Sequence, residues 1–334
     1  MSTIPITFSE TLPPYTVIGG REQLGSTGLS AVLLNRRGRF VRHHIFRDFE
    51  KAGFDTVISI ETEPVHYDID ELSARFPFIR FIMIKGTISI GNQINIAVSE
   101  LDSPLFFVLW NDQKIIAGGT AHRMAERLTA YEEKKSIKRL CTIPVIQSSR
   151  FETIPTLRAP ALLRKKFQIT THSPAYEGLP SLYPFDGVGI YDRDRFIKLG
   201  GYDGTLKSGY WQLMDFGFRA HLWGEEISAT QSLKLIYESD IHIEDDSAGT
   251  DYCRFYLKNL APVLRGSSAF LPINRFPGHL LRTRSAGSSG FFSAWDDFSE
   301  SRRWVQLNQF RWRCNPQTLA SHWNMDAIGE NGEN

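Results

Sequence analysis

The stretch LFFVLWNDQ at residues 105–113 sets five apolar side chains in a row before a tryptophan, an asparagine and an aspartate. An uninterrupted apolar run of this length is typical of a strand that is buried on both faces of a sheet. Open α/β sheets bind their ligands outside the carboxyl ends of the strands. Asp112 therefore follows the predicted strand where a ligand would lie, although an aspartate there can equally serve a turn or cap a helix.

Short apolar strands alternate with amphipathic helices before this run. The sequence predicts strands at 29–35, 55–61 and 78–84 and helices at 40–53, 67–76 and 91–101. The alternation predicts an α/β fold with a mostly parallel central sheet and helices on both faces. The sequence contains neither a GxGxxG fingerprint nor a P-loop motif. It therefore gives no support for the usual dinucleotide-binding fold or for a P-loop nucleotide site.

The rest of the chain is predicted from its composition and from the positions of its proline and glycine residues. Residues 1–28 form an N-terminal extension, and 145–183 are proline-rich and predicted to be irregular. Order returns with a helix at 210–224, a strand at 233–239 and an amphipathic helix at 252–264. Residues 265–334 form an aromatic-rich C-terminal extension, whose extreme end is expected to be disordered.

The charge balance excludes some classes of partner. The chain of 334 residues carries 38 Lys and Arg against 37 Asp and Glu, which gives no long-range field for nucleic acid. The basic cluster NRRGRFVRHH at 35–44 is either a solvated face or a phosphate contact. Three scattered cysteines disfavour a disulfide framework and indicate a reducing compartment. Without a signal-peptide pattern or a transmembrane run, a cytoplasmic protein is expected, with peripheral membrane contact left open.

Polar residues mark the ends of the predicted strands. Asn35 and Glu61 close two neighbouring strands, where they can line a crevice for a base and a ribose, although strands commonly end in polar turns. Asn95 lies within a helix, where asparagine is mildly unfavourable, which suggests a hydrogen-bonding role, although a plain surface asparagine explains it equally well. Asp112 is placed to hold a hard cation such as Mg²⁺.

The block RFIKLGGYDGTLKSGYWQLMDFGFRAHLWG at 195–224 adds a second group of candidates. A Gly-Gly turn comes before Tyr202 and Asp203, and glycine lets a ligand approach the backbone there. Asp215 and Arg219 stand at i and i+4 on one helix face, so a helical salt bridge is the ordinary explanation for Arg219.

Together these residues resemble the GT-A glycosyltransferases, in particular the large family-2 group, over roughly 29–262. The resemblance rests on Asn35, Glu61, Asn95, LWND, FIKLGGYD and MDFGFRAHLWG in that order. It implies a GT-A fold with a nucleotide half at about 29–118 and an acceptor half at about 119–264. The implied donor-binding residues are Asn35, Glu61, Lys85, Asn95 and Asn111, and the implied acceptor-binding residues are Gly200, Gly201, Tyr202 and Trp211.

The resemblance also implies metal and catalytic residues, with two departures from the family pattern. Trp110 replaces the first aspartate of the DxD metal motif, which leaves Asp112, with His242 as a further metal or phosphate contact. When Arg219 anchors the comparison, the acid pair falls on Gln212 and Leu213. Asp215 then matches the second acid of the motif, and a shift of two residues would place it as the base itself. Asp215 is expected as the catalytic base, with Asp203 as its substitute.

The predicted function is transfer of a sugar from a UDP, GDP or dTDP donor to a glycan or lipid-linked saccharide. The reaction is expected to be inverting and assisted by Mg²⁺ or Mn²⁺, which would stabilise the departing diphosphate. A degenerate member that binds nucleotide sugar or glycan without turnover is the alternative, and a nucleotidyltransferase is a more distant third. The sequence specifies no oligomeric state.

Overall fold

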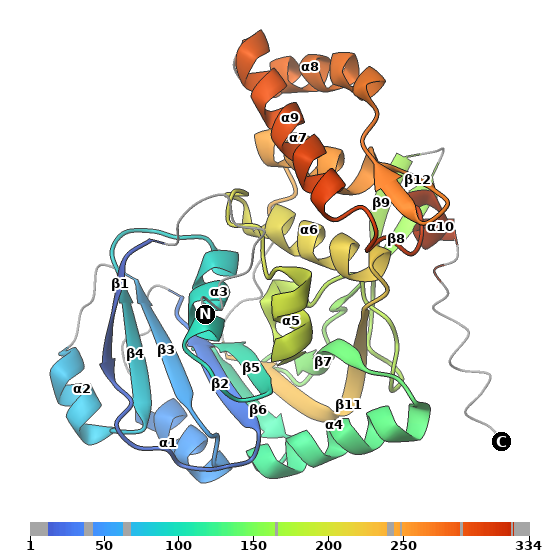
Figure 1. Cartoon of the computed structure of the whole chain (residues 1–334). Coiled ribbons are helices and arrows are strands. Elements are labelled where there is room, and N and C mark those ends of the chain that lie inside the picture. Colours follow the sequence, from blue (N-terminus) through green and yellow to red (C-terminus); the bar gives the residue numbers. More distant parts are fainter. Residues whose placement is uncertain are drawn as a thin grey trace.

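A nine-stranded sheet forms the centre of the protein in the computed structural model, which describes residues 13–36, 43–62, 68–163, 166–238, 244–247, 249–287, 290–321 and 323 (Figure 1). The strand order is β1-β4-β3-β2-β5-β10-β7-β11-β6. The strands are β1 (Tyr15–Gly19), β2 (Leu29–Leu34), β3 (Val57–Thr62), β4 (Ile79–Ile84), β5 (Leu105–Trp110), β6 (Gln113–Ala117), β7 (Arg139–Gln147), β10 (Gly189–Asp192) and β11 (Glu226–Tyr237).

The sheet is mostly parallel, as predicted. Strands β4, β3, β2 and β5 pair in parallel, and β7 and β11 run in the same direction as these four. Every residue of β2 is buried, as is every residue of β5 except the partly buried Leu105, which explains their uninterrupted apolar sequences. The carboxyl ends of these strands consequently meet at one edge of the sheet.

Helices cover both faces of the sheet (Figure 1). They are α1 (His43–Ala52), α2 (Ile69–Arg75), α3 (Ile90–Ser99), α4 (Ala121–Lys135), α5 (Arg193–Leu199), α6 (Gly209–Leu222), α7 (Thr250–Phe255), α8 (Phe276–Ser285), α9 (Phe291–Leu307) and α10 (Pro316–Ser321). Helices α1 and α4 lie on one face, and α3, α5 and α6 lie on the other (Figure 1). Among the described residues, none of the helices has the length and apolar character that a membrane crossing requires.

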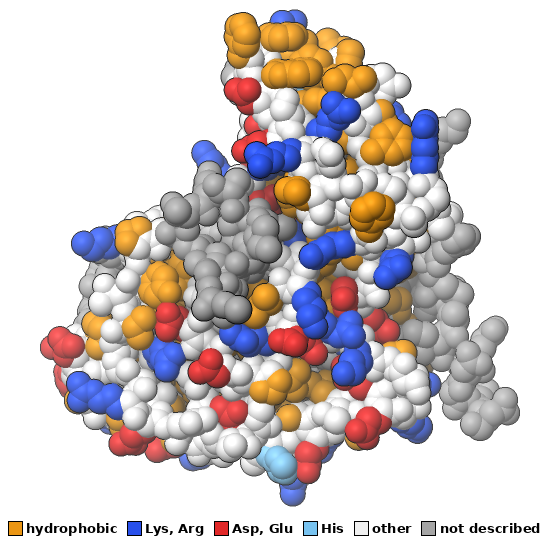
Figure 2. Space-filling model, viewed as in Figure 1, with side chains coloured by type: hydrophobic (Ala, Val, Ile, Leu, Met, Phe, Trp, Pro, Cys, Tyr) orange, Lys and Arg blue, Asp and Glu red, His pale blue; other side chains and the backbone are white. Residues whose placement is uncertain are grey.

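The described part of the C-terminal region, predicted as an aromatic-rich extension, is largely helical. Helices α8 and α9 pack together above α6, and Phe298, Val305 and Trp312 are buried against the rest of the protein (Figure 1). Exposed hydrophobic side chains gather over this pair, at the top of the view in Figure 2. They include Leu281, Phe291, Phe292 and Trp295. The extreme end GENGEN at 329–334, predicted to be disordered, lies outside the described part of the chain.

Three sequence predictions differ from the structure. Residues 1–28, set apart as an extension, contribute β1, which pairs antiparallel with β4. The stretch 145–183, predicted to be irregular, contains a hairpin of β8 (Leu157–Leu163) and β9 (Lys166–His172). The helix predicted at 252–264 ends earlier, because α7 continues as a π-helix only to Leu260 and β12 (Val263–Arg265) then pairs with β13 (Ser268–Phe270).

Candidate functional site

A charged cluster joins the carboxyl ends of β2, β5 and β11 to the segment before β10. Arg36 donates from Nη1 to Oδ1 and Oδ2 of Asp112, at 3.2 Å and 2.9 Å. Its Nη2 donates to Oδ2 of Asp186, which also accepts from the Tyr237 hydroxyl at 2.6 Å. The guanidinium lies 4.2 Å from the centroid of the Trp110 ring. In the part of the chain that the structure describes, one cation, two carboxylates and two aromatic side chains thus converge where open α/β sheets bind ligands.

Asp186 is held in a conformation that aspartate adopts only at a cost. It lies in a short 3₁₀ turn, Phe185–Gly187, with a φ of 58° in the left-handed region. Its carbonyl oxygen accepts from the Trp110 indole nitrogen at 3.0 Å. Because both its main chain and its side chain are engaged, the fold fixes Asp186 at the cluster.

The surroundings keep Arg36 charged. Burial alone would lower the pKa of its guanidinium, but the charges of Asp186, Tyr237 and Asp112 raise that pKa above its ordinary value overall. Burial also raises the pKa of the Tyr237 hydroxyl, and Asp186 raises it further. Tyr237 is therefore a neutral hydrogen-bond donor to Asp186.

Three of the predicted donor-binding residues lie together beside this cluster. The Asn35 amide nitrogen donates to the Ile60 carbonyl at 2.5 Å and lies 3.3 Å from Oε1 of Glu61. Ser59 donates to the same Glu61 oxygen at 2.7 Å. Asn111 accepts from the backbone N–H of Arg36 at 3.0 Å and donates to its carbonyl at 3.3 Å.

Of the other two predicted donor residues, Lys85 lies at the same edge of the sheet and Asn95 does not. Lys85 follows β4 and is exposed. Asn95 is 1% exposed, and its side chain donates to the carbonyl and accepts from the N–H of Tyr202, both at 3.0 Å. The hydrogen-bonding role expected for Asn95 therefore serves the fold, because it ties α3 to the Gly-Gly turn.

The carboxylates at this edge do not fit a divalent cation in this arrangement. Asp112 and Asp186 are the oxygen donors that such an ion would need. Both are held by Arg36, so an ion would have to displace the guanidinium. No group of three or more His, Cys, Asp or Glu side chains in the described ranges is arranged to hold a metal. His242, the other predicted metal ligand, lies outside the described residues.

The Gly-Gly turn predicted to meet the acceptor lies in the interior. Gly200 and Gly201 adopt φ values of 94° and 62°, which end α5 and turn the chain. Tyr202 is 0% exposed and stacks on Phe216, with 4.4 Å between the ring centroids. Arg219 donates to the Gly201 carbonyl at 2.7 Å. The turn thus packs against α6 instead of lining a cleft.

Asp203 and Asp215, the predicted catalytic bases, lie in a buried charge network. Lys258 joins them, with Nζ 2.5 Å from Asp203 and 3.0 Å from Asp215. Arg219 and Asn259 also donate to Asp215, Arg219 at 2.7 Å in the shortest contact and Asn259 at 2.8 Å. A catalytic base has to reach the acceptor hydroxyl. The two carboxylates are 1% and 0% exposed, so in this structure they occupy structural positions.

The network keeps Asp203 ionised and confirms one prediction. Burial alone would raise the pKa of the Asp203 carboxyl, but Lys258 and Arg254 lower it below its ordinary value overall. The helical salt bridge predicted between Asp215 and Arg219 is present, with both side chains fully buried.

Trp211 is the predicted acceptor residue that lines a cavity. A cavity of about 840 Å³ is bounded by β9, α6, α7 and α8, and its lining includes Tyr210, Trp211, Tyr252 and Tyr256 together with Arg275 and Arg282. The Trp211 indole nitrogen donates to the Ser247 carbonyl at 2.9 Å, which fixes the ring. Aromatic faces beside charged groups suit a saccharide, whose C–H faces stack while its hydroxyls form hydrogen bonds.

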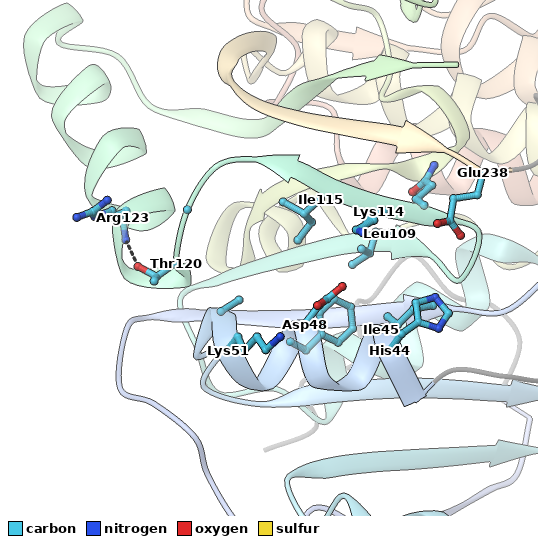
Figure 3. A pocket seen from close by; sticks show the side chains of 14 residues that line it. His44, Ile45, Asp48, Lys51, Leu109, Lys114, Ile115, Thr120, Arg123 and Glu238 are labelled. Atoms are coloured by element: carbon cyan, nitrogen blue, oxygen red, sulfur yellow. Dashed lines mark hydrogen bonds between the residues drawn. The ribbon is translucent and has the colours of Figure 1, made fainter. Parts of the chain in front are cut away.

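A second cavity, of about 350 Å³, lies between α1, β6 and the start of α4 (Figure 3). Asp48 and Lys51 of α1 face Lys114 and Ile115 of β6 across it (Figure 3). None of the site residues implied by the family resemblance lines this cavity, although His44 of the basic cluster at 35–44 does, so it is a competing place for a small ligand.

Sequence reasoning missed Arg36 and Asp186. Arg36 belongs to the basic run at 35–44, and the sequence shows the charge of this run but not the carboxylates that pair with it. Asp186 is 150 positions away from it along the chain. Only the antiparallel pairing of β10 with β5 brings Asp186 to the carboxyl end of β5.

Comparisons with known proteins concern the fold. No protein-family model matches the chain, and no curated protein matches it in sequence. The crystal structure of GalNAc-T7 with UDP, GalNAc and Mn²⁺ matches 91% of this chain and 58% of its own, with a TM-score of 0.52 and 14% identity. The crystal structure of S. aureus TarS matches 84% of this chain and 55% of its own, with a TM-score of 0.46 and 13% identity.

The chain thus spans less than two thirds of the length of both matched structures. The likeness to GalNAc-T7, a GT-A glycosyltransferase, confirms the predicted GT-A fold. At 14% identity it concerns the fold alone.

Proposed function

We propose that the protein transfers a glycosyl group from a nucleoside-diphosphate sugar to a glycan or lipid-linked saccharide, with inversion at the transferred carbon. One observation carries the proposal: Asn35, Glu61 and Asn111 meet at the carboxyl edge of a GT-A sheet, around Arg36 and Asp112. This is the edge where open α/β sheets bind their ligands. The matched GalNAc-T7 structure contains UDP, GalNAc and Mn²⁺, which supports the choice of donor class.

Each group at the edge suits one part of the donor. The Glu61 carboxylate is 2% exposed, so a nucleotide would have to open the site before this carboxylate could accept hydrogen bonds from ribose hydroxyls or from a base N–H. The Asn35 amide supplies both a donor and an acceptor beside it. Lys85, beyond β4, offers positive charge for the diphosphate, and Arg36 neutralises part of the negative charge of Asp112 and Asp186 that would otherwise repel it.

The acceptor is proposed to bind in the cavity around Trp211. Its tyrosine and tryptophan rings offer stacking faces for sugar rings, and Arg275 and Arg282 offer hydrogen-bond donors. The C-terminal region supplies both arginines, so this region would contribute to acceptor choice.

Binding without turnover is the second candidate. The observation that favours it is the burial of Asp203 and Asp215, which leaves neither expected base on an open surface. Hydrolysis of donor sugar in the absence of acceptor separates the two candidates. A transferase is expected to release free sugar slowly, whereas a binding protein would leave the donor intact.

Glu61→Gln is expected to weaken nucleotide binding about tenfold, because a hydrogen bond to a charged group contributes about 1.5–3 kcal/mol. Calorimetric titration of UDP, GDP and dTDP into the wild type identifies the nucleotide, and the variant is then titrated with it. Glu177→Gln is the matched control. Glu177 is hydrogen-bonded to Arg139, the first residue of β7, at the opposite edge of the sheet from Glu61. If none of the three nucleotides binds the wild type, the proposed function is wrong.

Trp211→Leu is expected to reduce glycan binding about fivefold, because the loss of an aromatic stacking partner costs about 1 kcal/mol. Binding is measured on a glycan array with labelled protein. Trp295→Leu removes an exposed indole from α9 and serves as the control. Equal signals from both variants would place the acceptor elsewhere.

A further inference from the structure

We infer that Arg36 is the resident cation of the Asp112–Asp186 pair, in the position that a divalent ion would need, so that nucleoside-diphosphate binding does not require such an ion. The part that concerns the nucleotide rests on the proposed function. The part that concerns the cation rests on the cluster alone.

The guanidinium spans the two carboxylates as a bridging cation would. Nη1 donates to both oxygens of Asp112, at 3.2 Å and 2.9 Å, and Nη2 donates to Asp186. The carboxylates are only 3% and 4% exposed. Removing one partner of a buried ion pair leaves an uncompensated charge, so the pair needs a cation at this place.

Position 110 fits an organic cation better than a metal. The family resemblance leads one to expect an aspartate there as the first acid of the metal motif. Trp110 removes that oxygen donor and places its ring 4.2 Å from the Arg36 guanidinium. An indole face attracts a guanidinium through its quadrupole, whereas it offers no lone pair to a divalent ion. The change from aspartate to tryptophan and the presence of Arg36 therefore complement each other.

The backbone of Arg36 is fixed as firmly as its side chain. Asn111 hydrogen-bonds both its N–H and its carbonyl, and the Tyr237 hydroxyl shares the Asp186 oxygen with Nη2. A divalent ion would have to break the side-chain contacts while this backbone anchor keeps the guanidinium close. Arg36 consequently competes with any ion for the same oxygens.

Titration with Mn²⁺ alone tests the cation. The wild type is expected to show no rise in melting temperature and no bound Mn²⁺ by paramagnetic resonance at millimolar Mn²⁺. Arg36→Ala is expected to melt lower in EDTA, to be restored in part by Mn²⁺, and to bind Mn²⁺ at least about thirtyfold more tightly than the wild type. Adding Asp112→Asn to Arg36→Ala should abolish that gain.

The matched control is Arg139→Ala. Arg139 is also buried, paired with Glu177 at 3.4 Å and stacked 3.7 Å from the Tyr131 centroid, but it starts β7 at the opposite edge of the sheet. It should lose stability without gaining Mn²⁺ binding. If Arg36→Ala does not fold, Arg36→Lys replaces it, because the single lysine nitrogen cannot reproduce the three contacts that Nη1 and Nη2 of Arg36 make with Asp112 and Asp186, and a gain of at least about threefold is expected. Mn²⁺ binding by the wild type as tight as by the variants would overturn the inference.

Titration with UDP tests the part of the inference that concerns the nucleotide. The wild type is expected to bind UDP in EDTA with a Kd within about threefold of its value in Mn²⁺, and Arg36→Ala is expected to require Mn²⁺. Wild-type binding that appears only with Mn²⁺ would overturn the inference and leave the proposed function standing. If UDP, GDP and dTDP all fail to bind in both conditions, the proposed function fails, and the Mn²⁺ titrations still decide whether Arg36 is the resident cation.

Discussion

Replacing Asp215 by alanine is expected to lower the free energy of unfolding by about 3–5 kcal/mol, since the change breaks a buried ion pair and leaves charge uncompensated. Arg219 is fully buried, and its guanidinium would keep only the carbonyls of Leu199 and Gly201 as partners. Lys258 would lose one of its two carboxylates. Urea unfolding at neutral pH measures the effect.

Helix α5 offers a matched control of the same spacing. Asp194 and Lys198 also stand at i and i+4, 3.7 Å apart, but their side chains are 80% and 74% exposed. Asp194→Ala is therefore expected to cost less than about 0.5 kcal/mol. Similar losses in the two variants would contradict the structural role assigned to Asp215. A folded, stable Asp215→Ala protein with abolished turnover would restore the original assignment of Asp215 as the catalytic base.

Gly217→Ala is expected to destabilise the protein by about 3 kcal/mol or more, because a β-carbon there has no room. It would lie 2.2 Å from the Leu182 carbonyl oxygen and 2.9 Å from the Tyr183 β-carbon. Overpacking of this kind typically costs about 1–3 kcal/mol, and here a main-chain atom is the obstacle, which cannot rotate away. The chain crossing α6 at this point continues directly to Asp186, so the close approach also positions the charged cluster.

Gly278→Ala is the control for this prediction. Gly278 lies within α8, and a β-carbon there would be no nearer than 3.8 Å to the end of the Arg282 side chain. Alanine exceeds glycine in helix propensity by about 1 kcal/mol, so this variant is expected to be as stable as the wild type or more so. Unchanged thermal unfolding of Gly217→Ala would show that α6 and the 182–183 segment do not approach as closely as described.

The parallel half of the sheet was predictable because its strands are buried on both faces. The sequences of β2 and β5 are almost wholly apolar. A short apolar run between polar turns is typical of a buried strand, so these strands could be recognised. Strand β1 and the β8–β9 hairpin were missed for the opposite reason. The burial of β1 is mixed, and β8 contains Pro160, so neither shows the alternation or the continuous run that identifies a strand.

The candidate site was predictable only where it follows a strand. Asn35, Glu61 and Asp112 were predicted to lie at one edge because the ends of adjacent parallel strands meet there, and the family resemblance added Asn111. The burial of Asp203 and Asp215 could not be predicted, because their partner Lys258 comes from a π-helix 55 positions after Asp203. A sequence shows spacing within one helix, as for Asp215 and Arg219, but not which charges a distant element contributes.

A crystal structure of the protein with the nucleoside diphosphate that it binds tests the central claim most directly. We expect the base and ribose within hydrogen-bonding distance of Glu61 and Asn35, and the diphosphate beside Arg36 and Asp112. A nucleotide found instead in the cavity between α1 and β6, against Lys51 and Lys114, would contradict the assignment of the sheet edge as the donor site.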